Sequence, residues 1–443
     1  MPRASEEVEE TRFKAFTESI DPTWVEEALN ATGAASIRRR RLPAEMVIWL
    51  VLGMALFRDT SIAMLVRQLD LVLPSPKRSK VAPSAIAQAR ARLGAGPLKW
   101  LFETCARKWA IASAEAHRWR GLAVFGLDGT TMRVPDSDAN RAHFGSQTAG
   151  SGRGVSGYPL VRLVTLMALR SHLLLAANFG PYAVSERKRA RELICELPDD
   201  SLLIVDRNFA YARDLVPIER HGHNTHWLTR ARKNHRWRVV RRLGPGDVLA
   251  EVLVNRGSRA ECPWLPERWP IRVVTYRRPG FRPQRLLTSL LDPAAFPAGE
   301  IRALYHERWE LELGFDEVKT VMLERNESIR SKSPAGVEQE LWGVGLAYNL
   351  VRLEMERAAA ELGLPPTRMG FKNSLIEIRG ALLVMTMAAP GNLPRLLRKM
   401  REGLQENVLP QRRQRSYPRA VKIKMSNYPR KRPPGRPPRR SGK

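Results

Sequence analysis

The first quarter of the chain has apolar residues at intervals of three and four, the spacing that gathers them on one face of an α-helix. The pattern runs through FKAFTESI, WVEEALN, AEMVIWLVLGMALF and SIAMLVRQLDLVL. The longest apolar run, from Met46 to Phe57, has 12 residues. Because a bilayer span needs roughly 20 residues, this run predicts a buried helix. Residues 1–115 are therefore expected to form an all-helical module.

A shorter helix is predicted in SAIAQARARLG, after a proline-rich break. Its polar residues Gln88, Arg90 and Arg92 favour contacts with a phosphate backbone or with base edges. A helical bundle with polar outer faces explains the same residues, because no strict helix-turn-helix pattern is present. A DNA-binding role for residues 1–115 is thus an expectation with a purely structural alternative.

From about residue 120 the pattern changes to short, partly β-branched apolar runs. GLAVFGLDGTTMRV, YPLVRLVTLMAL and SHLLLAANFG predict three strands, SERKRARELICEL a charged helix, and SLLIVDRNFA a further buried strand. Residues 213–297 alternate short strands with Pro/Gly turns, which predicts an antiparallel β insert. Helical spacing returns from Ala298 to about Arg357. The prediction is a mixed α/β protein.

The charge is strongly positive, with 74 Lys and Arg against 45 Asp and Glu and a formal net charge of +29. The last 33 residues, from Gln411, hold 13 of these cations and no acid, which leaves +16 for the rest of the 443-residue chain. The proline-rich tail cannot form a packed core and suits binding along phosphates or in a minor groove. A solubilising tail is the alternative. A second basic run, Arg38–Arg41, is either a phosphate contact or a solvated helix entry.

Cys105, Cys195 and Cys262 form no CxxC pair, which argues against a disulfide framework or a structural zinc site and predicts reduced thiols. The amino terminus, MPRASEEVEE, is acidic and lacks the apolar core of a signal peptide, so we expect a cytoplasmic protein.

Two acids each close an apolar run, Asp128 in AVFGLD and Asp206 in SLLIVD. Side chains at strand ends leave the core and reach a cleft, although a lone Asp at such a position more often caps a turn. Two such acids on adjacent strands favour a shared site.

The segment EIRALYHERWELELGFDEVKTVM carries a polar stripe. At ~100° per residue, Tyr305, Arg308, Glu312 and Lys319 fall within about 60° of one another. Asp316 lies about 20° from Tyr305 on the same wheel, so spacing alone leaves it as an alternative carboxylate. An exposed face with i,i+4 ion pairs would also explain the stripe.

The spacing Y-x2-R-x3-E-x6-K, filled by Tyr305, Arg308, Glu312 and Lys319, resembles the signature of the DDE transposases of the bacterial insertion sequence four family. Asp128 in GLDGTT and Asp206 in VDRNF resemble that family's two catalytic aspartates. The helical segments before residue 115 resemble its amino-terminal domain, and the likeness extends from about residue 20 to 430. The resemblance favours Glu312 over Asp316. Asn208 stands where the family often has Gly.

The resemblance implies a ribonuclease H-like core interrupted by the β insert. The implied domains are a helical DNA-binding domain at 1–115, core segments at 116–212 and 298–400, the insert at 213–297, and a disordered basic tail at 401–443. The implied catalytic triad, Asp128, Asp206 and Glu312, would hold two Mg²⁺ ions, with Mn²⁺ able to replace them. Tyr305, Arg308 and Lys319 would grip phosphates near the scissile bond.

In the family, a freed 3′-OH attacks the opposite strand to form a hairpin, and joining to a target follows. The insert provides an aromatic platform for a displaced base, for which Trp264 and Trp269 are candidates, each with a core or turn role as the alternative. A charged face of Lys188, Arg189 and Arg191 either contacts DNA or is simply solvated.

The expected partners are double-stranded element ends and target DNA, bound by a homodimer at the bacterial nucleoid. A catalytically silent DNA-binding protein derived from a transposase is the alternative function. It predicts damaged acids, whereas all three carboxylates are present. A structure-specific nuclease on the same core would cut element ends without joining them to a target.

Overall fold

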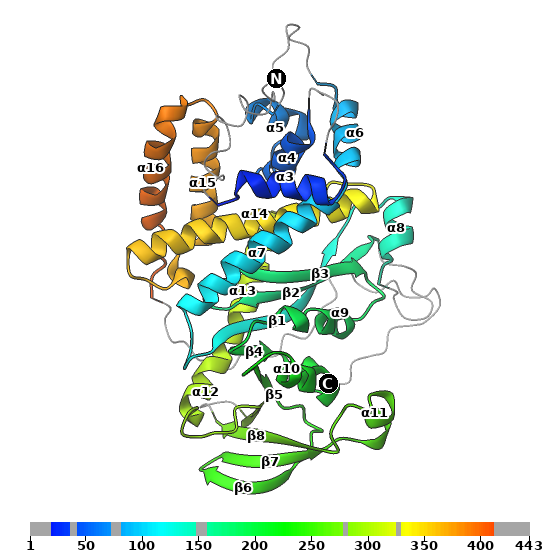
Figure 1. Ribbon diagram of the computed structural model, residues 1–443, viewed down its shortest axis with the longest axis vertical. Coiled ribbons are helices and arrows are strands. Elements are labelled where there is room, and N and C mark those ends of the chain that lie inside the picture. The colour runs from blue at the N-terminus through cyan, green and yellow to red at the C-terminus, as the bar shows by residue number, and fades with distance from the viewer. Residues whose placement is uncertain are drawn as a thin grey trace, which may run out of the picture.

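A computed structural model describes residues 19–35, 42–71, 81–147, 157–277, 282–324 and 329–411 (Figure 1). The basic run Arg38–Arg41 and the tail after residue 411 lie outside the described residues. The disordered tail was expected from residue 401, but a helix over Leu393–Gln405 continues past that point. Within them, no helix combines the length and the apolar content that crossing a bilayer requires. Cys105, Cys195 and Cys262 are free thiols, as expected.

The amino-terminal part is helical, as predicted. The apolar run at residues 46–57 folds as a helix whose residues from Val47 to Leu56 are all buried. Asp21 and Ser61 cap two of the other helices with their side-chain oxygens. The helices are α3 (Pro22–Ala31), α4 (Ala44–Leu56), α5 (Ile62–Gln68), α6 (Pro83–Leu93) and α7 (Gly96–Ala116).

Helix α6 corrects one expectation. Arg90 does not face outward, because its Nε donates to Gln339 Oε1 at 2.9 Å and its Nη2 to Ser331 Oγ at 2.9 Å. Arg90 therefore joins the amino-terminal helices to the second half of the chain. Gln88 and Arg92 are exposed and stay candidates for DNA contact.

The centre of the protein is a nine-stranded sheet of order β3-β2-β1-β4-β5-β9-β8-β7-β6. Its strands are β1 (Ala123–Arg133), β2 (Leu160–Ala168), β3 (Leu174–Pro181), β4 (Ser201–Val205), β5 (His226–Arg230), β6 (Arg238–Gly244), β7 (Asp247–Leu253), β8 (Arg268–Tyr276) and β9 (Gln284–Thr288). Strands β1 to β3 pair antiparallel, whereas β4 is parallel to both β1 and β5. This order confirms the expected ribonuclease H-like core.

The predicted antiparallel insert is present in β6 to β9. It continues the central sheet, because β9 pairs with β5. Strand β5 was expected within the antiparallel insert, but it runs parallel to β4 and so extends the core. The insert strands lie at the end of the molecule remote from α3–α6 (Figure 1).

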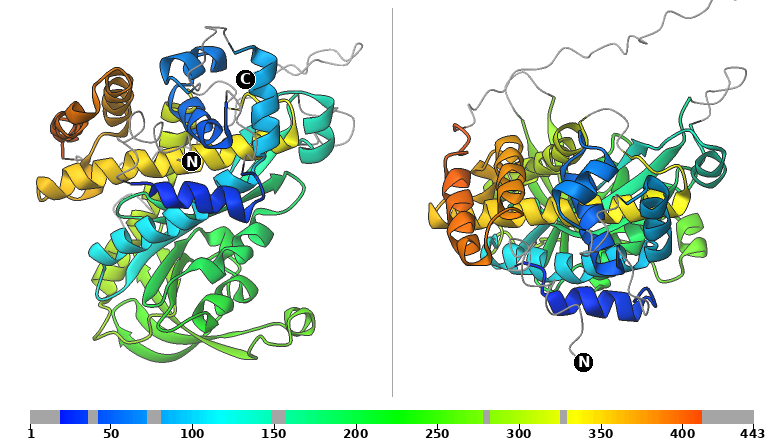
Figure 2. Two further views of the ribbon diagram at one scale, coloured as in Figure 1. Left: turned by 45° about the horizontal axis from the view of Figure 1, so that its top comes forward. Right: turned by 90° about the horizontal axis from the view of Figure 1, so that it is seen from above.

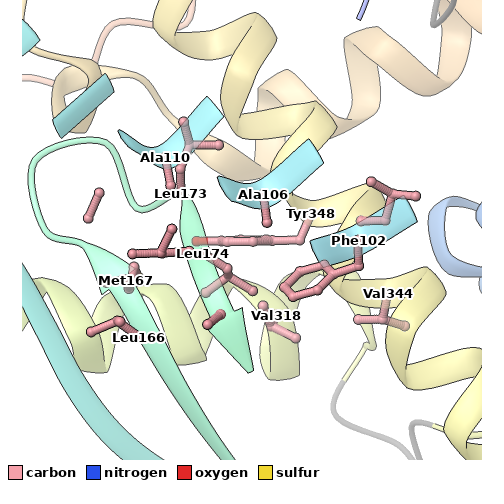
Figure 3. Close-up of a cluster of buried hydrophobic side chains, with 14 of the residues drawn as sticks. Phe102, Ala106, Ala110, Leu166, Met167, Leu173, Leu174, Val318, Val344 and Tyr348 are labelled. Atoms are coloured by element: carbon pink, nitrogen blue, oxygen red, sulfur yellow. The ribbon is translucent and has the colours of Figure 1, made fainter. Parts of the chain in front are cut away.

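Helices cover both faces of the core sheet. Apolar residues of α9 (Glu186–Glu192) and α10 (Ala212–Arg220) pack on Leu127, Leu203 and Val205 on one face. On the other, α7, α14 (Pro334–Glu361) and the segment carrying Glu312 enclose a buried cluster that includes Phe102, Leu174 and Val318 (Figure 3).

Helices α7 and α14 lie between α3–α6 and the sheet, and α15 (Phe371–Met385) and α16 (Leu393–Gln405) lie side by side against α14 (Figure 2). Two further helices are α8 (Asp138–Phe144) and α11 (Arg256–Glu261), and short 3₁₀ turns are η1 (Ile194–Glu196), η2 (Arg207–Phe209), η5 (Pro366–Arg368) and η6 (Pro390–Asn392).

The segment with the polar stripe is not one regular helix. It consists of α12 (Ala298–Leu304), a 3₁₀ turn η3 (Tyr305–Arg308), α13 (Trp309–Asp316) and a π-helical segment η4 (Glu317–Met322). A regular period of 100° per residue therefore does not apply between Tyr305 and Lys319. Such departures from α-helical geometry change the direction of the side chains that follow them and often occur at functional sites.

Candidate active site

Asp128 and Asp206 lie side by side in the sheet. Leu127 of β1 is paired in parallel register with Val205 of β4, so the next residue on each strand is one of the two acids. Strand β1 does not end at Asp128, as the sequence had suggested, because it stays paired with β2 as far as Arg133. Asp128 instead marks the point where β1 loses its other neighbour, β4. The carboxyl ends of parallel strands are where such folds place their ligands.

The Asp128 carboxyl group is half-buried and has a perturbed pKa. Burial raises this pKa to about 7. The backbone N–H of Gly129 donates to Asp128 Oδ1 at 2.8 Å and opposes the rise, as does Arg308, whereas the negative charges of Glu186 and Asp206 add to it. The site therefore carries excess negative charge that a cation would relieve.

Arg308 lies among the acids of the expected triad. Its Nη2 donates to Glu312 Oε1 at 2.9 Å, and its charge acts on both Asp128 and Asp206. The Glu312 side chain is 44% exposed. Burial lowers the pKa of Arg308, but the bond to Glu312 and the nearby negative charges outweigh it and raise that pKa overall. The guanidinium thus connects Glu312 with the two aspartates.

Tyr305 and Lys319 lie beside the same strand ends. Tyr305 is 7% exposed, and burial raises its pKa to about 12, so its phenol stays a hydrogen-bond donor at neutral pH. Lys319 Nζ donates to Thr130 Oγ1 at 3.0 Å. Thr130 is two residues after Asp128 on β1 and shares its face. Burial lowers the pKa of Lys319. The structure therefore brings all four residues of the Y-x2-R-x3-E-x6-K stripe to the neighbourhood of the aspartates.

Arg230 is a site residue that sequence reasoning missed. Thr229 of β5 is paired with Val205, so Arg230 continues the row formed by Asp128 and Asp206 on a third parallel strand. Its charge acts on Tyr305, and its Nη1 donates to Gln284 Oε1 at 3.3 Å. Its strand was predicted, but only the parallel pairing of β5 with β4 identifies Arg230.

Glu186, the first residue of α9, was also missed. Its side chain lies directly over Gly129, where a Cβ atom would come within 2.5 Å of Glu186 Cγ. The negative charge of Glu186 raises the pKa of Asp128 more than the negative charge of Asp206 does. The glycine after Asp128 is therefore needed for the approach of a fourth carboxylate.

Of the two tryptophans expected as platforms for a displaced base, Trp269 requires correction. Trp269 is 5% exposed, and its indole N–H donates to Glu219 Oε1 at 3.0 Å while its ring packs on Trp227. It is a core residue whose ring cannot receive a base in this structure. Trp264 is 42% exposed and stays a candidate.

The charged face expected on α9 is divided between interior and surface. Arg189 is 7% exposed and donates to Asn178 Oδ1 at 2.8 Å, so it does not contact DNA from this position. Arg191 lies 3.9 Å from Asp214, and Lys188 is exposed.

No three His, Cys, Asp or Glu side chains converge closely enough to hold a metal ion in the part of the chain that the structure describes. Asp128 and Asp206 are adjacent, but Glu312 is bonded to Arg308. The donor set still fits a hard cation, because carboxylate oxygens are the ligands that Mg²⁺ prefers and two further carboxylates, Glu186 and Asp206, act on Asp128. The exposed Glu312 would have to exchange Arg308 for the ion.

Comparison with known proteins agrees with this geometry. Residues 10–103 match the family model described as insertion element 4 transposase N-terminal, and residues 119–350 match the transposase DDE domain. The chain is 38% identical over 411 residues to the transposase InsG for insertion sequence element IS4 of Escherichia coli strain K12, covering 93% of this chain and 92% of that protein. It is 37% identical over 255 residues to the putative transposase InsZ of the same strain, covering 57% of this chain and 78% of that protein.

A piggyBac transposase, solved as a synaptic complex with hairpin DNA, aligns over 92% of this chain and 87% of its own with a TM-score of 0.44 and 12% identity. The family matches and the identity to InsG over nearly the whole chain establish what the arrangement of acids and bases had indicated: this protein belongs to the insertion sequence four family of DDE transposases.

Proposed function

We propose that this transposase binds the ends of its insertion sequence and catalyses metal-dependent DNA cleavage, through a hairpin, followed by strand transfer to a target in a cut-and-paste reaction. The observation that carries the proposal is that Asp128 and Asp206 directly follow the paired residues Leu127 and Val205 of two adjacent strands, with Arg308 connecting them to Glu312. Transposase DDE domains generally use divalent metal ions. Asp128, Asp206 and Glu312 are the residues that would hold them.

Two Mg²⁺ ions, for which Mn²⁺ would substitute, supply Lewis-acid activation of the attacking and leaving oxygens when bound. The other side chains act on the DNA. The guanidinium of Arg308 exchanges its bond to Glu312 for a phosphate, which it grips through two N–H groups. Tyr305 donates its phenolic proton to a phosphate oxygen, and Lys319 adds a point charge beside Thr130. The same residues serve each successive step, with Trp264 as the candidate platform for a base displaced at the hairpin.

The central experiment uses the purified full-length protein with DNA that carries the inverted repeats flanking its coding region. With Mg²⁺, we expect nicking at the repeat ends, hairpin-ended products and joining to a second plasmid. Scrambled ends should remain uncut. End binding without nicking in Mg²⁺ or Mn²⁺ would favour a silent DNA-binding protein, whereas cutting without joining would favour a nuclease.

Lys319→Ala is expected to reduce the rate of nicking by about 10²-fold and to change end binding little. The reason is that the Lys319 ammonium donates to Thr130, two residues after Asp128 on β1, where it would bind the phosphate next to the scissile bond. Single-turnover cleavage and gel-shift titrations measure the two effects. Lys99→Ala, at an exposed i,i+4 pair on α7, is the control. A parallel loss of binding and cleavage would make Lys319 a general DNA contact.

The insert carries a second basic surface on β6, the edge strand of the sheet. Arg241 and Arg242 are exposed on this strand, and an exposed arginine, Arg236, precedes it. Arg238 differs, because it donates to Glu251 Oε2 at 2.9 Å. We propose that Arg236, Arg241 and Arg242, the β6 arginines, follow a DNA backbone.

The DNA-binding constant K falls as the salt concentration rises, and each phosphate that a protein cation neutralises contributes about −0.9 to the slope of log K against log salt concentration. Replacing Arg241 and Arg242 with Ala should therefore reduce the magnitude of the slope for DNA binding by about 2. Fluorescence anisotropy over a series of salt concentrations measures it. Arg238→Ala removes a cation already neutralised by Glu251 and should change the slope less. An unchanged slope in the double variant would exclude Arg241 and Arg242 from the DNA interface.

Cut-and-paste transfer requires two element ends to be held together, so we propose that the protein acts as a homodimer on DNA at the nucleoid. Light scattering of the protein with end DNA should give two chains per complex. One chain per end, without pairing, would contradict this assembly.

A further inference from the structure

A buried polar network lies behind the helix that carries Glu312. Glu310 and Glu317 stand two residues before and five residues after Glu312, on α13 and at the start of η4. Within the regular turns of α13, at ~100° per residue, Glu310 points about 160° away from Glu312, and Glu317 lies on the side of Glu310 because His172 bonds to both. Whatever binds these two glutamates therefore determines the direction in which Glu312 points on the other side.

Five residues from three parts of the chain make the network. His172, in the turn between β2 and β3, places Nε2 2.9 Å from Glu310 Oε2 and Nδ1 3.3 Å from Glu317 Oε2. From α14, Tyr348 Oη donates to Glu317 Oε2 at 2.8 Å and Arg352 Nε donates to the same oxygen at 3.0 Å. The network thus connects α13 and η4 both to the turn between β2 and β3 and to α14.

The network is largely shielded from solvent, because His172, Tyr348 and Arg352 are only 2%, 0% and 1% exposed. Tyr348 lies among the apolar side chains Leu174 and Val318 (Figure 3). Burial alone would raise the pKa of Glu317, but Arg352 and His172 lower it to about 2. A buried ion pair contributes little net stability, because desolvation offsets its Coulomb energy, and its better attested effect is to select one arrangement.

The backbone around the network is also specialised. His172 has a φ of +65°, in the left-handed region that a non-glycine residue adopts only where its surroundings hold it there. Two glycines let α13 approach the sheet closely: a Cβ on Gly126 would lie 2.7 Å from Leu311, and one on Gly314 would lie 2.8 Å from Met167. The helix is therefore seated on β1 and β2, and the network fixes its rotation.

We propose that Glu317, Tyr348, Arg352 and His172 are positioning residues that fix the rotation of α13 so that Glu312 reaches the two aspartates. The inference deepens the proposed function and rests on it for the role of Glu312. Among the described residues, the hydrogen bonds of the network do not reach either aspartate, so its effect on the reaction passes through the orientation of Glu312 and the affinity of the site for divalent cations.

The test compares Glu317→Gln and Tyr348→Phe with a matched variant on α14. Glu354 is buried, at 3% exposed, and bonds to Arg357 and Arg401 on a different side of the helix. Glu354→Gln therefore controls for the loss of a buried ion pair. Binding of Mn²⁺ to the DNA-bound protein is followed by electron paramagnetic resonance, and urea unfolding identifies conditions in which each variant is fully folded.

In Glu317→Gln and Tyr348→Phe we expect the Kd for Mn²⁺ to rise at least five-fold and the Mg²⁺ concentration for half-maximal nicking to rise in proportion. End binding should stay within two-fold, and high Mg²⁺ should restore part of the nicking rate. Glu354→Gln should leave the Mn²⁺ affinity unchanged. If the two network variants behave as Glu354→Gln does, the inference is wrong. If the wild-type protein binds Mn²⁺ through Glu312 but does not cut element ends, the proposed function fails while the positioning role stands.

Discussion

Glu312→Gln and Asp206→Asn are each expected to abolish Mg²⁺-dependent nicking of element ends, by about 10³-fold or more, while end binding remains within a few-fold of wild type. The loss of one anionic oxygen ligand removes several kcal/mol of stabilisation from the developing charge, and each 1.4 kcal/mol corresponds to a factor of ten in rate. Binding persists because the arginines and lysines that contact phosphates are unaltered. Single-turnover cleavage and gel-shift assays on the same DNA measure both quantities.

Asp316→Asn is the matched control for Glu312→Gln. Asp316 ends α13, is exposed, and accepts a hydrogen bond from Thr320, so it is a second carboxylate on the same helix without a link to Arg308. Nicking should continue at close to the wild-type rate in this variant. A Glu312→Gln variant that nicks at the wild-type rate would overturn the assignment of the triad. If only Asp316→Asn lost nicking, Asp316 would be the third carboxylate in place of Glu312.

Asp128→Asn is expected to abolish nicking as well, and also to stabilise the protein at pH 8 in the absence of metal. The folded-state pKa of Asp128 is raised from 3.8 to about 7, so the folded protein holds this proton more tightly than the unfolded chain does. The raised pKa therefore contributes to the free energy of unfolding below pH 4. This contribution, up to about 4 kcal/mol, is lost as the pH rises through 7. The neutral amide avoids that loss.

Urea unfolding at pH 8 and at pH 4 tests this prediction. The difference in unfolding free energy between Asp128→Asn and wild type should be large at pH 8 and shrink toward pH 4. Added Mg²⁺ should stabilise the wild type alone, because a ligand that binds only the folded state raises its stability. An Asp128→Asn variant that is less stable than wild type at pH 8 would contradict the raised pKa that burial gives Asp128. The acid is thus a position at which function reduces stability.

Much of the site could be read from local features of the chain. Asp128 and Asp206 follow apolar runs that form β1 and β4, and the spacing of Tyr305, Arg308, Glu312 and Lys319 identified the family that the comparisons establish. The buried helix α4 followed from its unbroken apolar run. These features depend on residues close together in sequence, for which the period of apolar positions and the spacing of a motif carry the information.

Residue environments were harder to predict. Tryptophan and arginine are residue types that often contact DNA. In the structure, however, Trp269 donates to Glu219, and Arg90 donates to Gln339 and Ser331. In each case the partner lies at least 50 residues away in the chain. A polar or aromatic side chain can bind phosphate or satisfy a buried partner equally well, and only the packing of distant elements decides between them.

The sequence by itself therefore determined the kind of protein, the order of its elements and the three acids of its proposed centre. The tertiary structure decided what surrounds those acids. The parallel pairing of β5 with β4 adds Arg230 to their row, the bend at η3 and η4 redirects the stripe, and His172 and Arg352 meet behind Glu312 from positions 180 residues apart. Strand pairing and buried ion pairs join distant residues through contacts whose free energy depends on the whole fold, so no local pattern specifies them.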